Sequence, residues 1–466
     1  MRMWTRRPRV ISATLASVLG IGLLAGCGGG GPEKPDKKIT VWSLENLPAR
    51  MAVTKKIVHR FEKSSGVQVK VVGVAENQLP QLIMSAAASG NLPDVIGALP
   101  LGQLWQMYGN GLLNTKIAGD IVDGLGPGTF NSNALKLASD GKTQLAVPSD
   151  AWLQILVYRK DLFAKAGLPA PDSYRSMLKA ADELDTRGRV GASVATDPGD
   201  VFTQQSFESM ALANGCQLVD SAGDVHLDSA ACRRTFAAYD TLADKHGAAG
   251  LQTVDTTRAT YFAGRSPMVL WSSFILDELA GLRKDALPSC PDCKKDRHFL
   301  SRNSGVVTAM KGPDGKDPAQ FGEITSWAVT KTAETKASRS FVEYMMNTGY
   351  QDWLGMSPEG KIPVRSGTPD APTTFEQAWR SSKIGVDTRK PLNEVYSDKL
   401  LDQLLDGVTN MKRWGITQGQ GVLVGATNGE LPVPKAIGAM TSGQASPKEA
   451  AQKADEDVSA LSKSLQ

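Results

Sequence analysis

The chain contains few of the residues on which catalytic and metal sites usually depend. Its 466 residues include only four histidines and five cysteines. The sequence has no Gly-x-Ser-x-Gly elbow, no His-Glu-x-x-His helix and no phosphate-binding loop. His298 has no second histidine at the spacing of zinc ligands. We therefore expect a protein that is not an enzyme, with no metal site, no catalytic residue and no cofactor.

The main part of the chain also lacks a strong charge and a long apolar run. The formal net charge of +4 includes the arginines near the N-terminus, so the rest is close to neutral. A nucleic-acid-binding chain would show a basic stripe, and we expect no nucleic-acid partner. No apolar run of about eighteen residues or more, the length that a membrane helix needs, follows Cys27.

The first 27 residues differ sharply in composition from the rest. Arginines at positions 2, 6, 7 and 9 precede the uncharged apolar run of residues 10–24, which is short for a membrane span. The sequence Leu-Ala-Gly-Cys follows directly and ends at Cys27. This order resembles the lipobox of bacterial lipoproteins, in which the peptide is cut before the cysteine and the thiol is acylated.

The resemblance implies a lipoprotein signal peptide over residues 1–26 and lipidation, with chains such as palmitate, at Cys27. Several acyl chains together bury enough CH₂ groups for lasting attachment. Residues 27–37 have almost nothing to bury and predict a flexible tether. We expect a lipid-anchored protein on the extracytoplasmic face of the cell membrane. Two points stay open: Cys27 as a buried core cysteine, and Arg6-Arg7 as part of a twin-arginine rather than a Sec export signal.

Four cysteines follow the tether: Cys216, Cys232, Cys290 and Cys293. In an exported protein they suggest two disulfides, for which three pairings are possible. We favour the pairs nearest in sequence, Cys216–Cys232 and Cys290–Cys293. The spacing of the second pair is also that of thioredoxin-like redox motifs, but no strand and helix flank it. A structural disulfide is therefore the favoured reading.

About 430 residues remain after the tether, a length more natural for two domains than for one core. Short apolar strands are expected at residues 38–42, 67–71 and 95–98, with helices at 53–61 and 79–88 between them. This alternation predicts an α/β domain with a mainly parallel sheet. Further strands are expected at 151–158, 268–271 and 324–329, and Ser446 to Glu449 predicts the start of a terminal helix.

Several segments, taken in order, are similar to the sugar-binding class of extracellular solute-binding proteins, the receptors of ABC importers. These segments are Ile-Thr-Val-Trp at 39–42, the small-residue run and Pro-Asp-Val at 86–95, Val-Pro at 147–148 with residues 157–168, Phe-x-x-Gly-x-x-x-Met-like residues 261–268, Ile-Pro-Val-Arg at 362–365 and the terminal helix. The resemblance covers nearly all of residues 38–466. Residues 283–322 depart from the family pattern.

The resemblance implies a two-lobed, periplasmic-binding-protein-like α/β fold with hinge crossings and an interlobe cleft that closes around a solute. We assign residues 38–148 and 325–362 to the N-terminal lobe, and residues 149–324 and 363–466 to the C-terminal lobe. The expected ligand is a small-molecule carbohydrate, a di- or oligosaccharide. The expected partners are ABC permease subunits, and we expect a monomer.

A sugar site needs flat aromatic rings for the C–H faces and planar polar side chains for the hydroxyl groups. Four tryptophans lie at expected strand ends or crossings: Trp42, Trp152, Trp271 and Trp327. The polar side chains beside them or after the first two strands are Glu45, Asn46, Asn77, Gln78, Asp150, Ser272, Ser273 and Glu323. Each of these residues also has an ordinary structural reading, as core, loop or cap.

Two other functions stay open at this point. One is a binding lipoprotein for a non-sugar solute such as a peptide or a polyamine, whose site would need several acids around its aromatics. The other is a secreted glycoside hydrolase, because any two carboxylates can converge in a fold.

Overall fold

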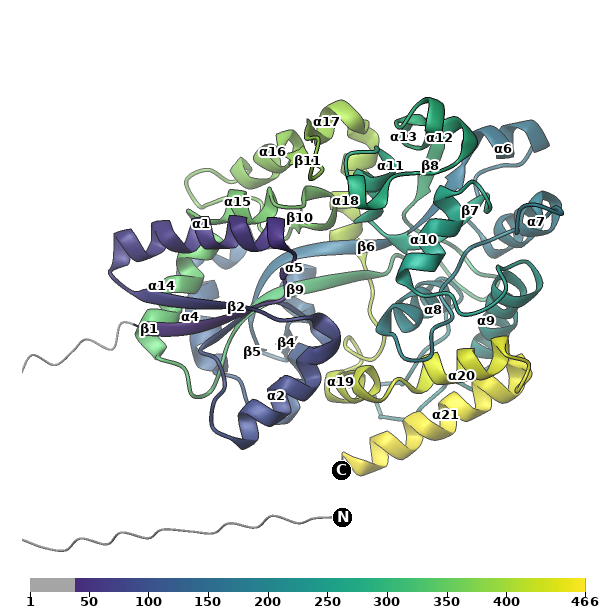
Figure 1. Ribbon diagram of the computed structural model, residues 1–466. Helices are drawn as coiled ribbons and strands as arrows, with labels where there is room; N and C mark the ends of the chain where they lie inside the picture. Colours follow the sequence, from purple (N-terminus) through teal and green to yellow (C-terminus); the bar gives the residue numbers. More distant parts are fainter. Residues whose placement is uncertain (1–37, 466) are drawn as a thin grey trace, which may run out of the picture. The chain divides into compact units, whose positions relative to one another are not determined.

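The computed structural model describes residues 38–465, so the predicted signal peptide, the tether and Cys27 lie outside the described residues. The N-terminal part alternates strands and helices as predicted (Figure 1). Its elements are β1 (Lys38–Ser43), α1 (Pro48–Ser65), β2 (Gln68–Gly73), α2 (Leu79–Ala88), β3 (Val95–Pro100), α3 (Leu101–Gly109), α4 (Thr115–Leu125), α5 (Ser132–Leu137) and the ribbon β4–β5 (Ser139–Asp140, Thr143–Gln144).

The middle of the chain opens with a long strand and continues mainly as helix. Its elements are β6 (Val147–Arg159), α6 (Lys160–Ala166), α7 (Tyr174–Leu184), α8 (Val201–Ala213), α9 (Ala230–Asp240), α10 (Val254–Phe262), β7 (Met268–Ser272), α11 (Ile275–Leu279), α12 (Pro291–Lys295), α13 (Phe299–Asn303), β8 (Ser304–Val307) and β9 (Gly322–Val329).

The C-terminal part is helical apart from short strands. Its elements are α14 (Thr335–Met346), α15 (Tyr350–Leu354), β10 (Ile362–Pro363), α16 (Thr374–Ser381), the ribbon β11–β12 (Lys383–Ile384, Lys390–Pro391), α17 (Leu392–Val395), α18 (Asp398–Asn410), α19 (Gly421–Glu430), α20 (Pro432–Thr441) and α21 (Pro447–Ser464).

Local sequence explains where the long helices begin and end. Pro48 occupies the first turn of α1, where its missing N–H costs nothing, and Gly66 ends the helix with a φ of 70°. At α21, the Ser446 hydroxyl accepts from the Glu449 N–H while the Glu449 carboxylate accepts from the Ser446 N–H, as the sequence predicts.

Eight of the strands form one mixed sheet. Six of them follow the order β10-β6-β9-β3-β1-β2, and β7 and β8 also pair with β6. β1 pairs in parallel with β2 and β3, but β9 enters beside β3 antiparallel, and β6 is antiparallel to β9. The prediction of a mainly parallel sheet is therefore wrong beyond the first three strands. β9 returns from the second half of the chain, so it enters the sheet in the opposite direction.

The strand β6 is long enough to serve two groups of elements. Its first half pairs with β9, and its second half pairs with β7 and β8. Near its start, Asp150 and Ala151 pair with both β9 and β10. The three segments predicted as crossings thus lie side by side in the sheet, and Figure 1 shows β6 and β9 running from the β1–β2 group toward β7.

The glycine-lined contact between α3 and α19 joins segments that are far apart in sequence. A Cβ added at Gly425 would lie 2.6 Å from the backbone nitrogen of Gln106, and one at Gly421 would lie 2.2 Å from Cδ2 of Trp105. A Cβ at Gly102 would lie 1.7 Å from Nδ2 of Asn428. The two helices therefore approach so closely that no side chain fits at these three positions.

Both predicted disulfides are confirmed. The structure pairs Cys216 with Cys232 and Cys290 with Cys293. All four sulfur-bearing side chains are buried.

A buried cation joins the crossing strands. The Lys361 side chain is fully buried, and its Nζ lies 2.6 Å from Oε1 of Glu45 and 3.0 Å from Oδ1 of Asp150. Arg50 donates to the other oxygen of Glu45 at 2.9 Å. Burial alone raises the pKa of Glu45, but Lys361 and Arg50 outweigh it and lower the pKa to about 2.

We predict that Lys361→Met lowers the free energy of unfolding by about 3–5 kcal/mol at pH 7, because Glu45 and Asp150 then lose their shared buried cation. The folded-state pKa of Glu45 is below its unfolded value, so its stabilisation is present above pH 4.5 and is lost toward pH 2. The difference between wild type and variant should therefore shrink as the pH falls. Urea unfolding followed by tryptophan fluorescence at several pH values measures it.

The control for this prediction is Lys116→Met, which removes an exposed lysine paired with Asp120 at 2.8 Å. It should leave the free energy of unfolding nearly unchanged. Equal losses for the two variants, or a Lys361→Met loss that does not depend on pH, would contradict the prediction.

Candidate functional site

A central pocket of about 650 Å³ lies between elements before β6 and elements from β6 onward. The first group contributes η1 (Glu76–Gln78), α2 and α3, and the second contributes β6, the start of α8, α10, the end of β7 and the end of α19. The lining residues are Glu76, Asn77, Pro80, Gln103, Trp152, Asp197, Gly199, Asp200, Val201, Phe202, Gln205, Val254, Trp271, Ser272, Phe274, Asn428, Gly429 and Leu431.

Four aromatic rings line this pocket: Trp152, Phe202, Trp271 and Phe274. The rings of Phe202 and Trp271 lie edge to face, with centroids 5.9 Å apart. The indole Nε1 of Trp271 donates to the Val254 carbonyl at 3.1 Å. Its polar atom is therefore satisfied by the protein, and the ring offers the pocket an apolar surface.

Two of these rings, and the ring behind a third, lie against arginines that do not line the pocket. The guanidinium of Arg258 lies 5.6 Å from the Trp271 centroid, and that of Arg50 lies 4.8 Å from the Phe274 centroid. Arg413 lies 4.7 Å from the Phe321 centroid, and the Phe321 ring contacts Trp152. Cation–π contacts of this kind hold the rings in place.

The same three arginines are neutralised by buried acids. Arg258 lies 2.7 Å from Glu278, Arg50 lies 2.9 Å from Glu45, and Arg413 lies 2.7 Å from Glu323. Arg413 also pairs with Glu208 at 3.1 Å. These arginines therefore fix the aromatic walls and leave no free positive charge toward the pocket.

Two buried amides in the pocket have no partner in the protein. Gln103 from α3 and Gln205 from α8 are each 7% exposed, and neither side chain makes a hydrogen bond within residues 38–465. The hydroxyl of Ser272, 8% exposed, has no partner in that range either. Buried polar groups are normally paired, so these three are suited to hydrogen bonds with a polar solute.

The charged groups of the pocket are acidic. Asp197 accepts from the Gly199 N–H, and Asp200 accepts from the Phe202 N–H and so caps α8, both at 2.9 Å. Glu76 makes no side-chain hydrogen bond in the described part of the chain, and its side chain is open to solvent. The surrounding protein partly desolvates Glu76 and raises its pKa above the usual value, and the charges of Glu323, Asp200 and Glu45 add to this rise.

The chain turns sharply between α19 and α20, beside the pocket. Leu431, which lies between them, has a φ of 53°, in the left-handed region that side chains other than glycine rarely adopt. The following Pro432 disfavours a helical conformation at Leu431 and so helps to end α19 there. This break leaves Asn428, Gly429 and Leu431 at the wall of the pocket.

Four of the twelve residues predicted for the site line the pocket: Asn77, Trp152, Trp271 and Ser272. Two others, Glu45 and Asp150, lie instead in the buried ion network around Lys361, where Asp150 also accepts from the Trp353 indole at 2.8 Å. The prediction that they face the solute needs correction, because the buried cation occupies their oxygens.

Glu323 is also engaged within the protein. Its two oxygens accept from Arg413 at 2.7 Å and from the Leu101 N–H at 2.9 Å, at the start of α3. Ser273 is fully buried, and its hydroxyl accepts from the Leu153 N–H at 3.4 Å. Both residues hold strands and helices in place and do not line the pocket.

Trp327 is part of the hydrophobic core and not of the pocket. It is fully buried among residues such as Phe341 and Trp353, and its ring fills the space above Gly97, where a Cβ would lie 2.2 Å from the indole. Trp42 is half-buried against the core, and Asn46 and Gln78 are exposed outside the pocket lining.

Sequence reasoning missed Glu76, Gln103, Phe202, Gln205, Phe274 and Asn428. The clearest signal is for Gln205, which lies in a polar run of α8, Thr203 to Ser206, that is buried throughout. A polar run inside a helix that is buried on every side needs partners, and a ligand can supply them.

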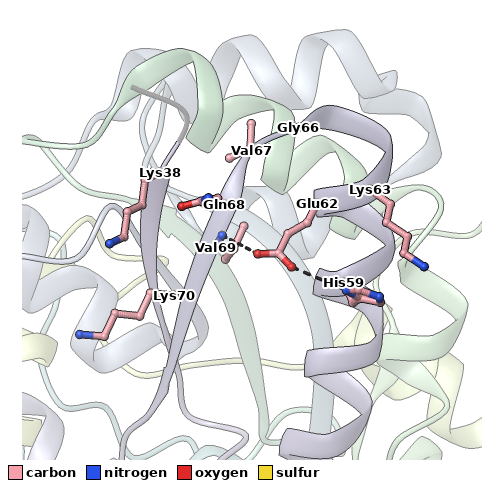
Figure 2. Close-up of a pocket in the computed structure, with 9 residues that line it drawn as sticks. All are labelled: Lys38, His59, Glu62, Lys63, Gly66, Val67, Gln68, Val69 and Lys70. Atoms are coloured by element: carbon pink, nitrogen blue, oxygen red, sulfur yellow. Dashed lines mark hydrogen bonds and ion pairs between the residues drawn. The ribbon is translucent and has the colours of Figure 1, made fainter. Parts of the chain in front are cut away.

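A second hollow of about 530 Å³, between α1 and β2, is a weaker candidate (Figure 2). Lys38 and Lys70 extend to one side there, and Lys63 extends to the opposite side. Its acid, Glu62, already accepts from the Val69 N–H at 2.9 Å. No set of free polar groups converges in this hollow, so we place the candidate site in the central pocket.

The described residues show no metal-binding cluster. Within residues 38–465, no group of three or more His, Cys, Asp or Glu side chains is placed to hold a metal ion. In the same range, no helix is long and apolar enough to cross a membrane.

Comparison with known proteins identifies a family and a fold. The family of bacterial extracellular solute-binding proteins matches residues 56–380, more than half of the chain. The Escherichia coli (strain K12) protein YcjN, named provisionally as an ABC transporter periplasmic-binding protein, is 28% identical over 429 residues, covering 88% of this chain and 91% of YcjN.

Solved structures of two-lobed binding proteins share the fold. MalE3 of T. maritima, solved with maltose, superposes with a TM-score of 0.70 at 17% identity, covering 91% of this chain and 99% of MalE3. A sugar transporter protein of Arthrobacter chlorophenolicus A6 with laminaribiose gives 0.69 at 18% identity, with the same coverage. The GacH receptor of Streptomyces glaucescens gives 0.68 at 19%, covering 91% and 98%. The predicted two-lobed α/β fold is confirmed.

We predict that Gln103→Leu changes the free energy of unfolding of the solute-free protein by less than about 1 kcal/mol, because the amide faces the pocket and makes no hydrogen bond within residues 38–465. Urea unfolding measures the change. The control is Gln320→Leu, which removes a buried amide that donates to the Gln154 and Phe321 carbonyls at 3.0 and 2.7 Å. The control should lose about 1–3 kcal/mol. Equal losses for both would show that Gln103 is satisfied.

Proposed function

The chain belongs to the family of bacterial extracellular solute-binding proteins, and we propose that it captures a sugar in the central pocket and delivers it to the permease subunits of an ABC importer. The observation that carries this proposal is the pairing of aromatic faces with unpartnered amides. Trp152 and Trp271 offer apolar surface, and Gln103 and Gln205 offer donors and acceptors. A saccharide presents both kinds of surface at once.

The size of the pocket supports a di- or oligosaccharide. About 650 Å³ falls in the range of small-molecule sites and exceeds the needs of a single sugar ring. Each aromatic ring that covers a sugar face contributes about 2 kcal/mol at 25 cal/mol/Å². Two structural neighbours were solved with maltose and with laminaribiose, and these disaccharides are consistent with such a ligand.

Residues on both sides of the proposed lobe boundary line the pocket. Glu76 and Gln103 belong to the proposed N-terminal lobe (38–148 and 325–362). Trp152, Trp271 and Asn428 belong to the proposed C-terminal lobe (149–324 and 363–466). We propose that solute binding brings these two sets together by bending at the β6, β9 and β10 crossings.

The other two candidate functions have less support. A glycoside hydrolase needs two carboxylates free for acid and base work. Asp197 and Asp200 each accept a backbone N–H at one oxygen, and Glu76 is the third lining acid, but no pair of these carboxylates is shown at the spacing of an acid and a base. A peptide or polyamine receptor remains the alternative among binding proteins, and solute panels decide between them.

We predict that at least one di- or oligosaccharide in a panel raises the melting temperature of the protein, and that Trp152→Ala weakens its binding about tenfold, because an aromatic face is lost. Isothermal titration calorimetry measures the affinity. The matched control is Trp42→Ala, which removes another half-buried tryptophan outside the pocket. The proposal fails if no sugar binds while peptides or polyamines do.

We also propose that the mature protein is held on the extracytoplasmic face of the membrane by lipid at Cys27, after export by the Sec or the twin-arginine route. The predicted outcome of Cys27→Ala is a shift of the protein from the membrane pellet to the soluble extracytoplasmic fraction, because the thiol that carries the acyl chains is gone. Fractionation and immunoblotting measure it, with Ser85→Ala, at an exposed residue of α2, as the control. A variant that stays in the pellet would refute lipid anchoring at this residue.

A further inference from the structure

All the charged side chains that line the central pocket are acidic. Its charged lining residues are Glu76, Asp197 and Asp200, and no Lys, Arg or His of residues 38–465 lines it. Asp197 and Asp200 are held by backbone N–H groups of the chain. Glu76 is the lining acid without a hydrogen bond or an ion pair within the described residues.

The basic residues closest to the walls are not available to Glu76. Arg413 is shared by Glu208 and Glu323, Arg50 pairs with Glu45, and Lys361 bridges Glu45 and Asp150. Arg258 pairs with Glu278 and Asp255. The groups that act on Glu76 electrostatically are therefore like charges, from Glu323, Asp200 and Glu45.

Two independent side chains indicate where a solute lies relative to this acid. Gln103 and Gln205 are more than nine-tenths buried, line the pocket and lack partners in the described chain. They come from α3 and α8, on two sides of the same pocket that Glu76 and Asn77 border. A solute that satisfies both amides lies in the pocket that Glu76 also borders.

Building on the proposed function, we infer that the sugar carries a protonated amine, as in an amino sugar or an aminocyclitol glycoside, and that Glu76 pairs with its ammonium group. An ammonium supplies the positive charge that the pocket lacks, and it relieves the repulsion among the acids. Aromatic rings in the same pocket also attract cations over their faces. A uronic acid or a sugar phosphate adds a further negative charge and is rejected.

The test compares disaccharides of one backbone that differ only at one position: a free amine, an N-acetyl group, a hydroxyl or a carboxylate. Calorimetry at pH 7 and low salt should show the amine bound at least tenfold more tightly than the hydroxyl counterpart, with the carboxylate weakest. Added NaCl should reduce the amine preference, because the attraction between the charges is screened.

The variant Glu76→Gln should reduce the ratio of amine to hydroxyl affinity from at least tenfold to less than threefold. Glu394→Gln, at an exposed acid outside the pocket, should keep the full ratio. The variant should remain folded, since the Glu76 side chain is exposed and makes no hydrogen bond or ion pair within residues 38–465. Melting curves at pH 8 should therefore show Glu76→Gln at least as stable as wild type.

The outcomes separate the two proposals. Equal affinity for amine and hydroxyl sugars, a preference for the carboxylate, or an unchanged ratio in Glu76→Gln would overturn the role of Glu76 and leave the sugar-receptor proposal standing. Binding of spermidine or peptides with no sugar bound at all would overturn both.

Discussion

The ammonium group of Lys361 is a single buried charge on which the junction of the sheet depends. It lies between Glu45, after the first strand, and Asp150, at the start of β6, and it directly precedes β10. Three segments distant in sequence are thereby tied at one point. Because buried charges are costly unless paired, the arrangement strongly disfavours alternative registers of these strands. The geometry of the crossings, and so of the pocket beside them, follows from this contact.

Paired buried charges also support the walls of the pocket. Aromatic rings form the surface, arginines lie behind them, and acids pair with the arginines. Such backing fixes the rings before a solute arrives, which lowers the entropic cost of binding. Gln103 and Gln205 are left unpartnered within this rigid frame. The two glutamines therefore contribute no hydrogen bond to the stability of the fold, and their amides remain free to bind a solute.

Local patterns were enough to predict much of the fold. The strands β1 to β3, the helix ended by Gly66 and the capping box at Ser446 depend on neighbouring residues, as do the two disulfides between nearby cysteines. The direction of β9 depends on a distant return of the chain, which no local pattern encodes. Glu45, Asp150 and Glu323 look like ligand residues in the sequence, because their basic partners are far away along the chain. Trp327 became core because Gly97 leaves room for its ring.

The glycine-lined contact of α3 with α19 has a consequence for how such a receptor diversifies. Gly102 leaves no room for a methyl group beside Asn428, whose side chain borders the pocket. The width of the pocket at this wall therefore depends on the absence of a side chain at Gly102. Exchanging Gly102 for alanine would displace the Asn428 side chain at the pocket wall while leaving the aromatic rings and the two glutamines unchanged. Substitution at Gly102 thus changes the size of the solute that fits the pocket, while the residues that bind the solute are retained.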